Sequence, residues 1–168
     1  MTLWMCRCDQ GRNFADFVGG GFVSLGWHTE ADPRAMDRDE LRAAIAEATP
    51  TMRESLVAAG AAMVSRFAAL PEPGDDVLTY HPPSRRYAVG EIVSDYIHDR
   101  ALHMPNARKR HSHMRRVIWR GLLPREALPE TARNALQPTI SFFRVRPEAE
   151  RAILQAFETH GEPLPARA

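Results

Sequence analysis

Residues 113–119 read His113-Met-Arg-Arg-Val-Ile-Trp119, and this stretch decides much of the fold. Charged and apolar side chains alternate along it in the manner of a β-strand. Successive side chains of a strand point to opposite faces. One face is therefore expected to hold His113, Arg115, Val117 and Trp119, and the other Arg116 and Ile118. Val117 and Trp119 would anchor such a strand to a hydrophobic core.

The strand lies inside a strongly basic segment. Residues 100–125 carry eight basic side chains and no acidic one, although the net charge of the chain is only +1. They are Arg100, Arg108, Lys109, Arg110, Arg115, Arg116, Arg120 and Arg125. Cationic groups neutralise phosphates, and guanidinium planes and aromatic rings stack on bases. The segment favours a nucleic-acid partner; a solvated basic loop beside a core strand is the alternative.

Outward from this segment, short strands and helices follow one another along the chain. The pattern predicts six strands, over residues 2–8, 22–27, 77–80, 87–93, 113–119 and 139–145. Helices are expected over residues 12–18, between 37 and 70 as a pair, over 128–136 and over 148–158. This mixture predicts an α+β fold, a small barrel of about six strands with flanking helices, and not a doubly wound sheet.

Capping residues set the expected ends of three helices. Asp37 or Asp39 would cap the first helix of the pair, and Thr51 the second, with Glu54 at the capping-box position. Pro147 is expected at the first position of the C-terminal helix. We expect one domain over residues 1–146, a helix over 147–160 packing on it, and a frayed tail over 161–168.

Composition narrows the class of protein. The chain has 168 residues, 44% of them hydrophobic and 26% charged, as in an ordinary globular domain. No apolar run is long enough to span a membrane, and the N-terminus has no signal-peptide pattern. The two cysteines, Cys6 and Cys8, fit a reducing compartment. The sequence therefore predicts a cytoplasmic protein with no membrane partner.

Motifs of catalytic or metal sites are missing. Cys6-x-Cys8 lacks the second cysteine pair of a zinc site, and His111-x-His113 lies in the most positive segment, which disfavours a dication. There is no Gly-x-Ser-x-Gly elbow and no phosphate-binding loop. A nuclease of the PD-(D/E)xK type needs an acidic residue two positions before its lysine, where this chain has Ala107. We therefore expect no metal site, no cofactor and no enzymatic activity.

Several separated motifs together resemble a known family. They are Trp4-Met-Cys-Arg-Cys-Asp-Gln-Gly11, Phe22-Val-Ser-Leu-Gly-Trp27, Gly74-Asp-Asp-Val77, the stretch from Tyr87 to Tyr96, His113-x-Arg115-x-Val117-x-Trp119 and Ser141-Phe-Phe-Arg-Val145. In this order they resemble the N-terminal PUA/EVE-like domains of Mrr-type, modification-dependent restriction endonucleases and related antiphage proteins. The resemblance covers residues 3 to 145. One departure is Asp9, which stands where relatives often have Gly.

The resemblance implies a pseudo-barrel whose pocket accepts a flipped, modified base. Such a base is held by stacking and by hydrogen bonds to its edge. The residues expected at the base pocket are Trp27, Tyr96, His113 and Arg115. Those expected to contact phosphates are Arg7, Arg12, Arg108, Lys109, Arg110 and Arg116. Trp119 is expected in the core, and Trp27 either there or in the pocket.

The function implied is that of a sensor of modified DNA bases in restriction or phage defence. In the restriction enzymes a nuclease domain follows this domain, so we expect binding without cleavage and an effector nuclease or operon partner. Two alternatives stay open: a PUA-type module that binds RNA, and a non-catalytic regulator that acts through protein contacts.

Overall fold

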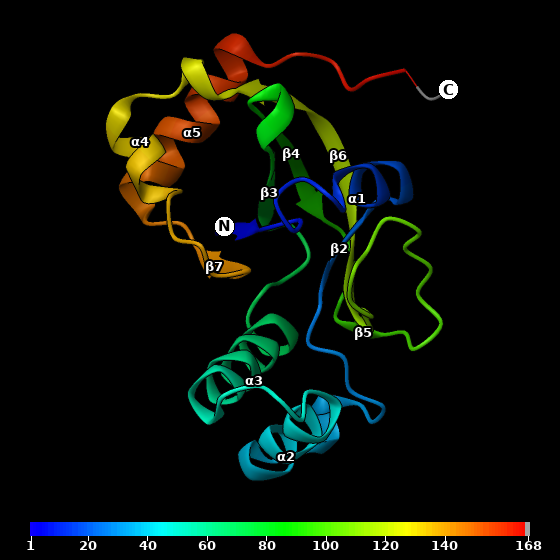
Figure 1. Cartoon of the computed structure of the whole chain (residues 1–168). Coiled ribbons are helices and arrows are strands. Elements are labelled where there is room, and N and C mark those ends of the chain that lie inside the picture. The colour runs from blue at the N-terminus through cyan, green and yellow to red at the C-terminus, as the bar shows by residue number, and fades with distance from the viewer. Residues whose placement is uncertain (167–168) are drawn as a thin grey trace.

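The computed structural model describes residues 1–166 and has one curled sheet with helices on both faces (Figure 1). The strands of this part are β1 (Leu3–Cys6), β2 (Phe22–Leu25), β3 (Asp76–His81), β4 (Arg86–Ile92), β5 (Ile97–His98), β6 (His113–Pro124) and β7 (Phe142–Arg144). Their order is β2-β6-β4-β3-β1-β7, and β5 also pairs with β6. β1 and β3 are parallel, and the other pairs are antiparallel. The expected α+β class with flanking helices is confirmed, and the curled sheet forms a half-barrel.

The long strand β6 bends the sheet into a half-barrel. Its first residues pair with β2 and β5, and its later residues pair with β4. Between Val89 and Gly90 the register shifts, so Gly90 faces Trp119 and Arg120 is bulged out. A Cβ on Gly90 would lie 2.7 Å from Val117 and 2.8 Å from Trp119. Bulges of this kind bend and twist a strand, and glycine permits the close approach.

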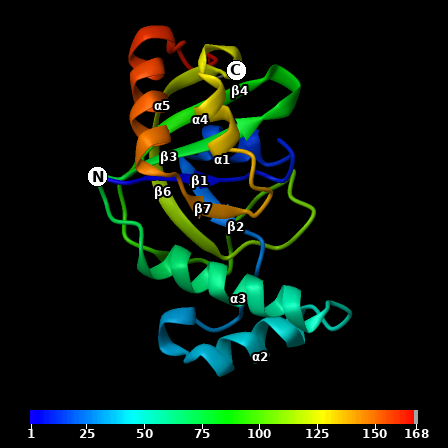
Figure 2. The ribbon, with the colours of Figure 1, turned by 90° about the vertical axis from the view of Figure 1, so that its left-hand side faces the viewer.

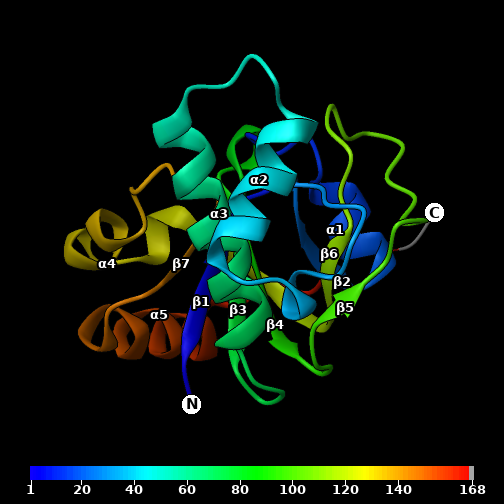
Figure 3. The ribbon, with the colours of Figure 1, turned by 90° about the horizontal axis from the view of Figure 1, so that it is seen from below.

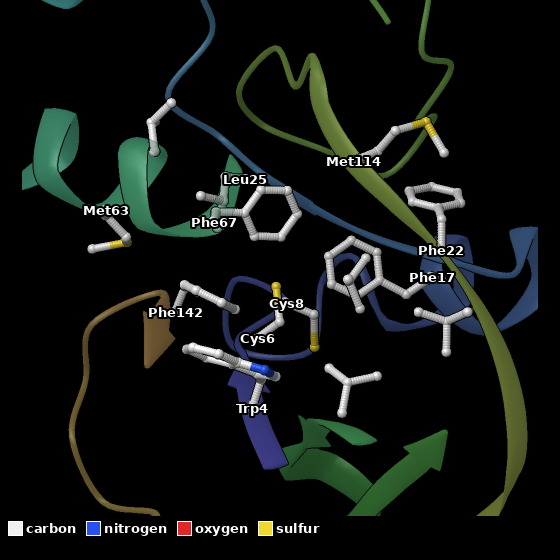
Figure 4. Packing of buried hydrophobic residues seen from close by; sticks show 14 of the residues in the cluster. Trp4, Cys6, Cys8, Phe17, Phe22, Leu25, Met63, Phe67, Met114 and Phe142 are labelled. Atoms are coloured by element: carbon white, nitrogen blue, oxygen red, sulfur yellow. The ribbon is translucent and has the colours of Figure 1, made fainter. Parts of the chain in front are cut away.

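Both faces of the sheet are buried, each against a different set of helices. β1 illustrates this, because all four of its residues are buried. Trp4 and Cys6 belong to one hydrophobic cluster, here called the inner core, which includes residues of α1 (Phe14–Gly20) and α3 (Glu54–Ala69) (Figure 4). Leu3 and Met5 belong to the outer core, formed with α4 (Glu130–Ala135) and α5 (Pro147–His160) (Figure 2).

The helices α2 (Arg38–Ala48) and α3 lie side by side at one end of the half-barrel (Figures 1 and 3). α2 begins as expected: Asp37 accepts from the backbone of Glu40, whose side chain accepts in return from Asp37. The cap expected at Thr51 is wrong, because α3 starts after Arg53. Thr51 lies in the turn that follows α2, which the bond from the Met52 amide to the Thr49 carbonyl closes.

The C-terminal part follows its prediction as far as α5. Pro147 occupies the start of that helix. The tail is held at Glu162, which exchanges two backbone hydrogen bonds with Leu122, and Leu164 packs against the inner core. Of the tail expected to fray, residues 167–168 lie outside the described residues. Within residues 1–166, no helix combines the length and apolar character needed to cross a membrane.

Candidate nucleic-acid interface

A hollow of about 130 Å³ opens where the loop after β1, the end of β2 and the basic segment meet; we call it the first pocket. It is lined by Arg7, Asp9, Asn13, Ser24, Leu25, Gly26, Trp27, Lys109, His111 and Ser141. Pockets for drug-sized molecules typically measure about 300–1,000 Å³. The first pocket therefore has the size for a single small ring system rather than for a whole cofactor.

Neutral polar groups line the first pocket. Ser24 Oγ lies 2.6 Å from Nδ1 of His111, and both residues are buried. Burial lowers the pKa of His111 to about 4, so its imidazole is neutral at pH 7 and can offer a donor or an acceptor at Nε2. Asn13 is 2% exposed, and its Oδ1 has no hydrogen-bond partner in the described structure. Buried amide oxygens are rarely left unpaired, so the lining of the first pocket includes a residue with an unused acceptor, Asn13, and a neutral imidazole, His111.

Trp27 forms an aromatic wall of the same pocket. A Cβ on Gly60 of α3 would lie 2.6–2.8 Å from three ring atoms of the indole, so the helix backbone lies directly against one face of the ring. The Trp27 side chain is only partly buried. Lys109 Nζ lies 6.0 Å from the ring centroid. The pocket thus combines an aromatic plane with a cation at its rim.

The loop after β1 places Asp9 and Asn13. Asp9, Gln10 and Gly11 have φ values of 55°, 56° and 91°, in the left-handed region. Three such residues in succession are unusual, and strained backbone often marks a functional site. Asp9 forms a two-bond ion pair with Arg108, which lowers the pKa of its carboxyl group, and lies 3.6 Å from Arg12. The only carboxylate lining this pocket is therefore neutralised.

Tyr96 and His113, expected in the base pocket, lie buried behind Trp27. Burial lowers the pKa of His113 to about 4, so the ring is neutral. Its Nε2 is 2.5 Å from the Trp27 carbonyl, which can only accept, so Nε2 carries the proton. Nδ1 then accepts from the Tyr96 hydroxyl at 2.6 Å. The two residues fix the backbone of Trp27 and do not line the pocket.

Arg115 also points inward and does not line the pocket. It is 2% exposed, and its guanidinium donates to the carbonyls of Phe67 and Ala68, in the last turn of α3, at 3.0 and 2.9 Å. Cationic donors commonly satisfy the free carbonyls at a helix C-terminus. The alternation of faces along β6 is confirmed, because residues 113, 115, 117 and 119 are buried and 116 and 118 are exposed.

The residues expected to bind phosphates divide into three groups. Arg7 lines the first pocket, but its guanidinium donates to the carbonyls of Leu136 and Pro138 at 2.7 Å. Arg108 and Arg12 face Asp9, and Arg110 pairs with Glu30 at 2.9 Å. Lys109 and Arg116 are exposed, and of these two only Lys109 reaches the pocket.

Several arginines of the basic segment are therefore neutralised by acidic residues from other parts of the chain. Besides Arg108 and Arg110, Arg100 pairs with Glu30, and Arg120 pairs with Asp76 and Glu91. Each acidic partner lies outside residues 100–125, where a count along the chain does not find it. Lys109 is the basic residue of this segment that lines the first pocket.

Sequence reasoning missed three residues of the site: Asn13, Ser24 and His111. Asn13 lies between basic and aromatic residues in a loop, and Ser24 in an apolar strand, so neither carried a signal. For His111 the sequence suggests a metal-chelating pair with His113 or a donor to phosphate, and not a buried group of a base pocket. Within residues 1–166, no cluster of three His, Cys, Asp or Glu residues is suited to hold a metal ion. Cys6 and Cys8 are buried in the inner core, which raises the pKa of both thiols (Figure 4).

A sequence model of one family, described as "Domain of unknown function (DUF8426)", matches residues 6–139. The chain belongs to the DUF8426 family. No curated protein matches this DUF8426 chain in sequence.

Solved structures resemble the DUF8426 chain in fold. The Pho92 YTH domain in complex with m6A aligns with a TM-score of 0.51 at 12% identity, over 95% of this chain and 87% of that one. The YTH domain of Zygosaccharomyces rouxii MRB1, in complex with N6-methyladenosine RNA, gives 0.49 at 12% identity, over 94% and 86%. Rpa0253 from Rhodopseudomonas palustris gives 0.44 at 12%, over 95% and 94%. The likeness to the Pho92 domain shows that the DUF8426 chain has a YTH-like fold.

Proposed function

We propose that this chain binds a modified nucleobase flipped out of DNA, and that it acts as a sensor without nuclease activity in restriction or phage defence. The observation that carries the proposal is the first pocket itself. It sets an aromatic wall, an unpaired buried amide oxygen and a neutral imidazole around a space for one ring, with a lysine at the rim.

Each part of the pocket suits one part of a flipped nucleotide. The indole of Trp27 offers a surface for stacking, which contributes about 1–3 kcal/mol per base. Asn13 and His111 offer uncharged hydrogen-bonding groups to the base edge, where charges would be costly to desolvate. Lys109 offers a cation to the phosphate. Tyr96, His113 and Arg115 act in this proposal as positioning residues for Trp27 and α3.

The defence role rests on the resemblance of the motifs to Mrr-type enzymes. An effector nuclease would be a separate partner or domain, since the described residues supply only a binding pocket in this proposal. RNA is the second candidate ligand. It is favoured by the likeness to the Pho92 YTH domain, whose structure is a complex with m6A. A regulator that acts through protein contacts alone would bind no nucleic acid.

The test is a fluorescence-anisotropy titration at physiological salt, because such affinities depend on ionic strength. The ligands are DNA duplexes that carry cytosine, 5-methylcytosine, 5-hydroxymethylcytosine, glucosylated cytosine or N6-methyladenine, with N6-methyladenosine RNA and unmodified RNA alongside. We expect one modified DNA to bind at least about tenfold more tightly than its unmodified twin, a difference of about 1.4 kcal/mol. Preference for the modified RNA would select the second candidate, and equal weak binding to every ligand would refute both.

Two variants tie that preference to the pocket. Trp27→Ala removes the stacking surface and should lower the affinity for the preferred ligand by about 5- to 150-fold, the equivalent of 1–3 kcal/mol. Asn13→Asp keeps the shape of the side chain but adds a negative charge, so it should abolish the preference. Arg116→Gln is the matched control, because Arg116 is exposed on β6 and does not line the pocket. A preference that survives both pocket variants contradicts the assignment.

A further inference from the structure

A second hollow, of about 410 Å³, also borders Trp27; we call it the second pocket. It is lined by Gly26, Trp27, His28, Ala48, Thr49, Met52, Lys109 and Arg110. Gly26, Trp27 and Lys109 line the first pocket as well. The two pockets are therefore separated by no more than the thickness of these side chains.

The second pocket has an apolar wall and a cationic rim. Met52 and Ala48 come from the turn after α2 and the end of that helix, and they face a space that Trp27 also borders. Lys109 and Arg110 supply the charge, and no carboxylate lines this pocket. Glu30 stands outside the lining and pairs with Arg110 and with Nε2 of His28. Nδ1 of His28 is buried and has no partner in the described structure.

We propose that the second pocket holds the nucleobase next to the flipped one, so that the chain reads two consecutive nucleotides of one DNA strand. This inference rests on the proposed function and extends it to sequence context. Enzymes that act on flipped bases take part of their sequence preference from contacts to flanking nucleotides. Here Met52, Ala48 and Trp27 border the space for a ring, and His28, whose buried Nδ1 has no partner in the described structure, lines the same space.

The position of Lys109 supports one continuous ligand across both pockets. The phosphate that links two nucleosides lies between them, and Lys109 is the basic residue that lines both hollows. Its ammonium is the group that would contact this linking phosphate. A single nucleoside, which has no such phosphate, would occupy the first pocket alone.

Two methionines allow the pockets to be observed separately. Met52 lines the second pocket. Met104 reports on the first, because its sulfur lies 3.3 Å from the hydroxyl of Ser24, which lines that pocket. With methyl-labelled methionine, the whole chain is titrated in an NMR experiment with 5-methyl-2′-deoxycytidine and N6-methyl-2′-deoxyadenosine. The same modified nucleosides are then supplied as dinucleotides, with deoxyadenosine on the 5′ or the 3′ side.

We expect a nucleoside to shift the Met104 methyl signal alone, and a dinucleotide of one polarity to shift both methyl signals and to bind at least fivefold more tightly. A dinucleotide that shifts Met104 and leaves Met52 unmoved overturns the second pocket and leaves the proposed function standing. If neither signal moves with any ligand, both proposals are overturned.

Two tryptophan substitutions at alanines of α2, one inside the lining of the second pocket and one outside it, control for indirect effects. Ala48→Trp places a ring in the second pocket from an exposed position at the end of α2, so the core is undisturbed. It should reduce dinucleotide affinity to that of the nucleoside and keep the Met104 shift. Ala46→Trp, exposed on the same helix and outside the lining, should change neither. Undiminished dinucleotide binding by Ala48→Trp would overturn the inference.

Discussion

The two faces of the sheet are both buried, yet they differ in what they bury. The outer core between the sheet and α4 and α5 contains apolar side chains and one buried tyrosine, Tyr87, against which the half-buried Tyr80 packs. The inner side holds most of the buried polar residues of the described structure, among them Asn13, Ser24, Thr29, His111, Ser112, His113 and Arg115. Burying a polar group costs free energy unless it is paired.

The difference assigns separate roles to the two faces. On the outer face, α4 and α5 pack against the sheet, so burial of apolar side chains stabilises the fold there (Figure 2). On the inner face, the network of Tyr96, His113 and Arg115 uses buried polar groups to hold Trp27 and the end of α3 in place. The free energy lost by burying these polar groups is offset in part by their hydrogen bonds, which also fix the geometry around the first pocket.

Acid should have the largest effect and should destabilise the inner side of the sheet first, because the two buried histidines lie there. His111 and His113 have pKa values of about 4 in the folded chain, against 6.5 for an ordinary histidine. The unfolded chain therefore binds more protons between these values. The free energy of unfolding should fall as the pH drops from 6.5 to 4, by about 3 kcal/mol for each histidine. Hydrogen exchange should show β2 and β6 losing protection before α5; simultaneous loss would contradict this assignment.

Removing a buried side chain from the outer core should lower stability without changing the pocket. Ile153→Ala deletes part of a fully buried residue of α5 and should reduce the free energy of unfolding by about 2–5 kcal/mol. Ile140→Ala is the control, because that residue is 45% exposed and should change stability by less than about 0.5 kcal/mol. Urea unfolding measures both. The preference of the folded Ile153→Ala protein for modified DNA should be unchanged, and its loss would show that the two faces are coupled.

A methyl group added at Gly60 of α3 should disturb the first pocket, because it would displace the Trp27 ring. Gly60→Ala places a Cβ 2.6 Å from the Trp27 indole, so the ring has to move. We expect the preference for modified DNA in anisotropy titrations to fall by about tenfold, or about 1.4 kcal/mol. Gly19→Ala on α1 is the control: nothing lies within 4 Å of its added Cβ, and alanine favours a helix by up to about 1 kcal/mol. Unchanged preference in Gly60→Ala would contradict the role of Trp27.

The smallest effect should come from removing the charge of Lys109 at the rim of the first pocket. Lys109→Gln removes one cation that contacts phosphate in the proposed complex, so the slope of log affinity against log salt should decrease by about 1. Arg110→Gln should change it less, because its guanidinium is paired with Glu30 at 2.9 Å. Titrations at 50, 100 and 200 mM salt give both slopes. Equal slopes for the wild type and Lys109→Gln would exclude that contact.

Local sequence patterns predicted the elements of the fold well. The alternation from His113 to Trp119 placed β6 and its two faces correctly, and Asp37 and Pro147 marked the starts of α2 and α5. Thr51 failed as a cap because the turn after α2 takes up the residues before Arg53. A capping motif describes a local preference, and a neighbouring turn with its own hydrogen bonds overrides it.

The site was predicted less completely. Trp27 and Lys109 were named from the sequence and do line the first pocket. Asn13 and His111 were missed, since their importance depends on burial and on partners far along the chain. Tyr96, His113 and Arg115, which the sequence places at the base pocket, do not line the first pocket in the structure, where they bond to Trp27 and the end of α3.

The sequence by itself determined the α+β class, the approximate positions of all the described strands except β5, the two faces of β6 and the density of positive charge between residues 100 and 125. These follow from side-chain periodicity and composition, which act between neighbours in the chain. Only the tertiary structure decided which arginines are neutralised and which side chains surround Trp27. Those outcomes depend on contacts between distant residues, such as Arg108 with Asp9 and Arg115 with the end of α3.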